Sequence, residues 1–91
     1  MNPTKPQIKI ERKSEVLRRI PFSKATLHRK INDGTFPPSI SLGANSVGFL
    51  AHEVDAIIAA IVLKKDLSLV VSQLVEQRQF LFNDHVFAVA A

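Results

Sequence analysis

The 91-residue sequence contains no cysteine and no long apolar run. Without cysteine the chain has no disulfide, no thiolate nucleophile and no cysteine-rich zinc site. No apolar run approaches the roughly 18 residues that a membrane-spanning helix needs, and residues 1–10 lack the apolar segment of a signal peptide. These absences predict a soluble cytoplasmic protein, and the length of 91 residues predicts one domain with a modest core.

Negative charge is scarce in the first third of the chain. Residues 1–32 carry nine lysines and arginines against two glutamates, a net charge of +7, whereas residues 33–91 carry three against six acidic residues, a net charge of −3. This asymmetry predicts an oriented surface for a polyanion. No segment pairs a lysine-rich face with a broad aromatic one, so we expect no membrane partner.

The stretch from Phe22 to Gly34 carries helix-end residues on both sides. Ser23 is a favourable N-cap, and Phe22 before it can pack on Leu27. Gly34 suits the left-handed residue that closes many helices, and the two prolines at 37 and 38 prevent a continuation. A helix over residues 23–33 is therefore predicted.

One side of this predicted helix is a narrow apolar stripe, because Leu27 and Ile31 align at 100° per residue. The opposite side is small, polar and cationic. It carries Ala25, Thr26 and Arg29, with Lys30 and Asn32 at its edges. Small residues permit close approach to a DNA major groove, and an arginine can pair bidentately with guanine. An ordinary solvated face has the same composition, so the neighbouring elements must decide.

A shorter helix is predicted just before it, with Ser14 as a candidate N-cap and an end at Pro21. The connection to Ser23 is then about three residues long, which is typical of a helix-turn-helix whose second helix enters the major groove. Residues 1–11 lack periodicity and are predicted to form a flexible arm.

Beyond Gly34, two short alternating runs flank the turn-forming residues 43–46. They predict a β-hairpin over residues 39–50, with one apolar face inward, placed like a wing beside the helix-turn-helix. Phe36 is expected to anchor the preceding loop in the core. The fold class is therefore mainly α with a small β-hairpin, a winged helix-turn-helix plus a C-terminal helix.

Two further helices are predicted over residues 52–63 and from Asp66 to about residue 83, because the apolar phase is lost near Lys64 and restarts at Leu67. Residues 12–63 are expected to form the DNA-binding domain, and residues 64–91 a helical extension. The fourth helix is apolar enough either to wrap onto the core or to form an oligomer interface. The residues proposed for that interface are Leu67, Val70, Val71, Leu74 and Leu81.

Three segments, in this order and spacing, resemble the AlpA-type prophage regulators of the MerR-like and excisionase-like winged helix-turn-helix group. They are Glu15-Val16-Leu17, the run from Ser23 to Ile31 with Gly34-Thr35-Phe36-Pro37, and Leu42-Gly43 with the run from Ser46 to Leu50 and Glu53-Val54-Asp55-Ala56. The resemblance implies a small bacterial DNA-binding protein that activates transcription, often of an integrase gene, or acts as an excision factor that bends DNA. The family commonly has an arginine where Asn45 stands and an aromatic residue where His28 stands.

Together these inferences predict a set of DNA contacts. Base edges are assigned to Ala25, Thr26 and Arg29, and the wing contacts to Asn45 and Ser46. Phosphates are assigned to Arg12, Arg18, Arg19, Ser23, Lys24, His28 and Lys30. For Arg18 and Arg19 the alternative is an interaction with the negative end of their own helix.

No pattern for catalysis, a cofactor, a metal or a small-molecule substrate is present. The three histidines are far apart, no glycine loop precedes a helix, and Glu53 and Asp55 are expected only to complement a helix N-terminus. The rival function from another class is a protein-interaction module that uses the fourth helix.

Overall fold

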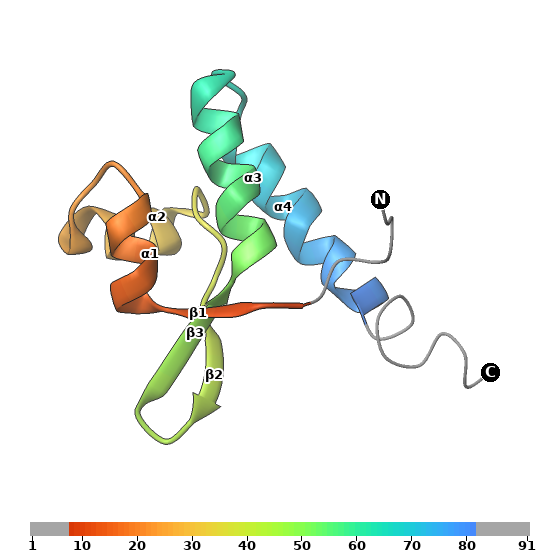
Figure 1. Cartoon of the computed structure of the whole chain (residues 1–91). Helices are drawn as coiled ribbons and strands as arrows, with labels where there is room; N and C mark the ends of the chain where they lie inside the picture. The colour runs from red at the N-terminus through yellow and green to blue at the C-terminus, as the bar shows by residue number, and fades with distance from the viewer. Residues whose placement is uncertain (1–7, 82–91) are drawn as a thin grey trace, which may run out of the picture.

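A computed structural model describes residues 8–81 of the chain (Figure 1). The elements, in chain order, are β1 (Ile10–Arg12), α1 (Lys13–Arg19), α2 (Lys24–Asp33), β2 (Ile40–Gly43), β3 (Ser46–Leu50), α3 (Ala51–Val62), α4 (Leu67–Gln77) and the 3-10 helix η1 (Arg78–Phe80). The prediction of a mainly helical chain is confirmed, and the predicted β-hairpin is part of a three-stranded antiparallel sheet. Among the described residues, no helix has both the length and the apolar character needed to cross a bilayer.

The ends of α2 and α4 are set by the local residues that the sequence indicated. The Ser23 hydroxyl accepts from the Thr26 amide at 3.2 Å, and Gly34 closes α2 with a left-handed φ of 81°. Asp66 caps α4 by accepting from the amides of Ser68 and Leu69. The Ser23 and Asp66 side chains accept from backbone amides that the start of a helix leaves without partners. Gly34 adopts the left-handed conformation that closes the end of α2.

The start of α1 differs from the prediction, because Ser14 is not its cap. The helix begins at Lys13, and the Arg12 amide donates to the Glu15 carboxylate at 2.7 Å. A glutamate at the third helical position reaches back to the cap amide, so the cap residue itself needs no hydroxyl. At the other end, Ile20 is extended before Pro21, and residues 20–23 join α1 to α2.

The sheet has three strands in the order β1-β3-β2, all antiparallel. The prediction of a flexible arm up to residue 11 was wrong for its last two residues, because Ile10 pairs with Leu50 and Glu11 pairs with Phe49. The strand β1 supplies the backbone groups that a two-stranded hairpin leaves unpaired along one edge of β3.

The prediction that the hairpin has one apolar face inward was also wrong. Ile40 lies opposite Gly48 and Ser41 lies opposite Val47, so the apolar residues of β2 and β3 point to opposite faces. Phe49 enters the core, whereas Leu42 is 43% exposed on the other face. A bulge between Ser41 and Gly43 adds one residue to β2, and the alternation of the sequence does not reveal this register.

The core lies where α1, α2, α3 and α4 meet the inner face of the sheet. It consists of Val16, Ile20, Leu27, Phe36, Phe49, Val54, Ile57 and Val71. Phe36 is fully buried, as predicted, and its ring meets those of Phe22 and Phe49 edge-on at centroid distances of 6.3 and 5.9 Å. These edge-to-face contacts hold the end of α2 and the hairpin in fixed positions.

α4 lies beside α3 and packs on the core of the same chain (Figure 1). Four of the five residues proposed for an oligomer interface lie in or against this core, and the fifth, Leu81, is half-buried. They are Leu67, Val70, Val71 and Leu74. That face is therefore occupied within one chain. The predicted extension of the helix toward residue 83 runs beyond the described residues.

Candidate nucleic-acid interface

The outward face of α2 carries Ala25, His28, Arg29 and Asn32, all exposed, while Leu27 on the other side is buried. Two residues of the predicted face lie closer to the core than expected. Thr26 is half-buried, and its hydroxyl accepts from the Ser23 hydroxyl at 3.2 Å. The Ser23 hydroxyl is thus engaged in capping α2.

Lys30, the other such residue, is half-buried as well. Its ammonium nitrogen lies 5.4 Å from the centroid of the Phe22 ring. At 100° per residue, Lys30 is turned well away from the direction of Arg29. The Lys30 side chain therefore does not share the outward orientation of Arg29, which its predicted contact with the same DNA segment would need.

Arg29 is an exposed cation of the outward face, and Lys24, in the first turn of α2, is exposed to one side of that face. Arg12 and Arg18, at the two ends of α1, are exposed too. Within residues 8–81, no carboxylate lies within ion-pair distance of any of these four side chains. Their charges are consequently available to an external anion.

Asn32 was not among the predicted DNA contacts, although it is exposed beside His28 and Arg29. It follows His28 by four positions and Arg29 by three, which places all three on one side of a helix. The helical period was therefore sufficient to find it. Its amide can pair bidentately with adenine.

His28 lies at the edge of this face, where α2 approaches the start of α1. The Lys13 ammonium nitrogen is 3.0 Å from His28 Nε2. An ammonium only donates, so this contact requires Nε2 as the acceptor. Two polar side chains from two helices thus converge at one point next to the outward face of α2.

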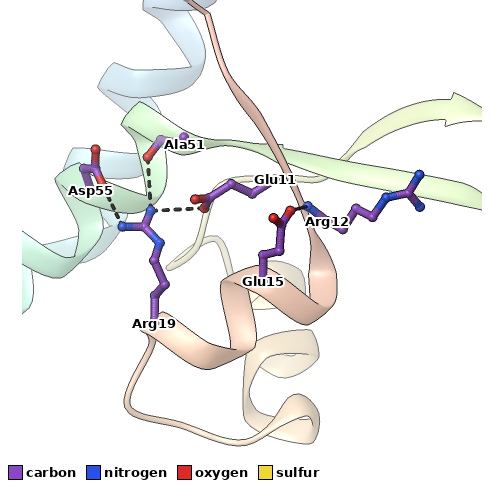
Figure 2. Close-up of polar contacts among 6 residues, drawn as sticks. All are labelled: Glu11, Arg12, Glu15, Arg19, Ala51 and Asp55. Atoms are coloured by element: carbon purple, nitrogen blue, oxygen red, sulfur yellow. Dashed lines mark hydrogen bonds and ion pairs between the residues drawn. The ribbon is translucent and has the colours of Figure 1, made fainter.

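Arg19 is held by a different set of partners, as Figure 2 shows. Its guanidinium donates to Asp55 at 2.8 Å, to Glu11 at 3.1 Å and to the Ala51 carbonyl at 3.5 Å. The hydrogen bond to Asp55 is the main cause that raises the pKa of Arg19, and partial burial opposes it. Arg19 therefore joins α1 to β1 and α3, while the Arg12 side chain extends away from this cluster (Figure 2).

Arg78 makes a second ion pair, with the buried Glu53. The guanidinium donates to the two carboxylate oxygens at 2.8 and 2.6 Å and to the Pro38 carbonyl at 2.9 Å. The hydrogen bond to Glu53 raises the pKa of Arg78. Glu53 and Asp55 were expected only to complement a helix N-terminus, but each is bound to an arginine from another element.

The hairpin tip is uncharged, because residues 39–50 contain no acidic or basic side chain. Asn45 has a left-handed φ of 63° and is exposed, whereas Ser46 is half-buried. The tip projects away from the helices (Figure 1). It offers an amide, a hydroxyl and backbone groups to a partner, without an ionic attraction.

Comparison with known proteins places these elements in one family. A family model described as prophage CP4-57 regulatory protein (AlpA) matches residues 9–60, from β1 through most of α3. No curated protein and no solved structure matches the chain significantly. The matched residues make up more than half of the sequence and include α1, α2 and the whole hairpin. The chain belongs to the AlpA family of prophage regulatory proteins.

Proposed function

We propose that this protein is a sequence-specific double-stranded DNA-binding regulator of transcription in a prophage or genomic island. In this proposal α1 and α2 are the helix-turn-helix, α2 enters the major groove, and the β2–β3 hairpin is the wing. The observation that carries it is the outward face of α2, where Arg29 lies with the exposed residues Ala25 and Asn32 and has no carboxylate partner among residues 8–81. The family is a regulatory one, and the proposal assigns the chain no catalytic reaction.

The proposed contacts follow the exposure of each side chain. Ala25, Arg29 and Asn32 face the base edges, and Thr26 lies at the margin of that surface. Phosphates are assigned to Lys24, Arg12, Arg18 and the Lys13–His28 pair. Asn45 at the hairpin tip approaches the backbone or the minor groove. Arg19 is left out because Glu11 and Asp55 bind it.

Activation of an integrase or excision gene is the regulatory role we propose. A single unit of this size contacts a short site, so two copies on adjacent sites belong to the proposal. The same surface would serve an excision factor that bends DNA. A gel assay with the site placed at different positions along a fragment separates the two, because only a bending protein changes fragment mobility with position.

The test is a series of DNA titrations by fluorescence anisotropy at increasing salt, with a duplex selected from a random-sequence pool. Four cationic phosphate contacts predict a slope of roughly −3 to −4 in log K against log salt. Arg29→Ala is expected to cost roughly 1–3 kcal/mol on the selected duplex and little on random duplexes. Lys24→Ala is expected to weaken all duplexes alike and to reduce the slope by about 1.

Arg29→Lys is the matched control, because it keeps the charge and removes the bidentate geometry. It should lose base preference while keeping the salt slope. Salt-independent binding, or base preference unchanged in both Arg29 variants, would contradict α2 as the recognition helix.

A further inference from the structure

A shallow depression of about 350 Å³ lies between the α1–α2 connection, α2 and the end of α3. Its lining combines three lysines with an apolar floor and includes no carboxylate. Lys30, Lys64 and Lys65 supply the positive charge, and Phe22, Ile61 and Leu67 supply apolar surface. Within residues 8–81, none of the three lysines forms an ion pair. An anionic group with an apolar neighbour is the chemistry that complements such a site.

Lys64 occupies a backbone position that glycine adopts more easily than lysine does. Lys64 has a left-handed φ of 55°, and the amides of Lys64 and Lys65 donate to the carbonyls of Ile61 and Ala60 at 3.2 and 2.9 Å. This is the hydrogen-bond pattern of a Schellman helix end, in which the left-handed residue is usually glycine. At this position the Lys64 ammonium interacts favourably with the negative end of α3 and adds its charge to the depression.

The surface around this corner is unusually apolar for a solvent-facing region. Val62, Leu63 and Leu69 are 72%, 65% and 55% exposed. Leu63 and Leu69 line a second depression of about 470 Å³ between α3 and α4, and Lys65 lines both depressions. The α3–α4 connection lies at the end of the molecule opposite the hairpin tip (Figure 1). Apolar centres with a charged rim are typical of protein–protein interfaces.

We propose that this corner binds an acidic segment of a protein partner. An apolar side chain of the segment enters the depression over Ile61 and Leu67, and flanking carboxylates contact Lys30, Lys64 and Lys65. Duplex DNA fits less well, because a phosphate backbone has no apolar group for the floor and Lys30 is turned away from Arg29. This proposal goes beyond DNA binding and stands independently of it.

The test uses a fluorescein-labelled peptide in which aspartate alternates with leucine and phenylalanine, titrated with the full chain. Lys64→Gly is the informative variant, because it removes the ammonium and also relieves the backbone, so loss of binding cannot come from unfolding. It should weaken peptide binding about threefold, the scale of one exposed ion pair, and Lys64→Gly with Lys65→Ser about tenfold. Lys9→Ala, which removes the same charge elsewhere, should bind like the parent chain.

Amide chemical shifts locate the contact and separate this proposal from the DNA proposal. On peptide addition, the amides of Phe22, Ile61 and Lys65 should shift while that of Arg29 stays in place. A peptide with serine in place of leucine and phenylalanine should bind much more weakly. Four results would each overturn the proposal. The serine peptide could bind equally well, or both lysine variants could bind the peptide like the parent chain. Self-association of the protein could be the sole cause of the shifts, or random duplex DNA could displace the peptide.

Discussion

Replacing Arg78 tests how α4 and η1 are joined to the rest of the fold. The Glu53 side chain is 1% exposed and the Arg78 side chain 24%, so Arg78→Ala leaves a buried carboxylate without its partner. Breaking a fully buried pair costs about 3–5 kcal/mol, whereas an exposed pair is worth about 0–1 kcal/mol. Because Arg78 remains partly solvated, we expect the free energy of unfolding to fall by about 2–3 kcal/mol.

Urea titration and thermal unfolding followed by circular dichroism measure this loss. For a domain of this size, 2–3 kcal/mol corresponds to a decrease in Tm of roughly 10–20 °C. The double variant Glu53→Gln, Arg78→Gln should lose less free energy of unfolding than the sum of the losses in the two single variants. The reason is that neither a buried charge nor an unmatched arginine remains in the double variant. The expected coupling energy is about 2 kcal/mol.

Arg18→Ala is the control, since Arg18 is exposed and has no ion-pair partner among the described residues. Its effect should stay within about 0.5 kcal/mol. If Arg78→Ala were as mild as Arg18→Ala, or if the double variant showed no coupling, the Glu53–Arg78 contact would not be what attaches this part of the chain.

Three further stability predictions follow from single positions. Lys64→Gly should raise the free energy of unfolding by about 1 kcal/mol, because glycine adopts the left-handed φ of 55° without the clash of a Cβ; an unchanged Tm would argue against strain there. Gly48→Ala should cost about 1–3 kcal/mol, because the new Cβ would lie 2.5 Å from Ile10 Cγ2. Adding Ile10→Ala should recover part of that loss, and additive losses would exclude this contact as its cause. Ser23→Ala should lower stability by about 0.5–2 kcal/mol through loss of the α2 cap, as judged by urea midpoint.

The helices could be predicted from the sequence because their ends depend on neighbouring residues. Ser23 and Gly34 bound α2, Pro21 follows the end of α1, and Asp66 caps α4, each within a few positions of the backbone it affects. The outward face of α2 follows from the same local geometry, since a period of 3.6 residues fixes which side chains share a side. The same period could have identified Asn32 as a residue of that face.

The sheet could not be predicted with the same success, because its pairing joins distant residues. β1 contains three residues and pairs with Leu50, which is 40 positions beyond Ile10. The hairpin faces depend on a bulge in β2 that leaves no trace in the alternation of apolar and polar residues. The sequence allowed the fourth helix either to pack on the core or to form an oligomer interface, and only the packing of its own Val71 and neighbouring residues on the core separates the two.

The same limit applies to charge, because the sequence does not reveal which arginines, such as Arg19 and Arg78, are already paired with a carboxylate in the fold. The ion pairs that distinguish them join residues 36 positions apart for Arg19 and Asp55, and 25 apart for Arg78 and Glu53. Arg19 and Arg78 are thus neutralised within the fold. The charge that a polyanion meets is therefore set by the exposed cations of α1 and α2, and this is why Arg29, rather than the total of +7 in residues 1–32, carries the prediction of base preference.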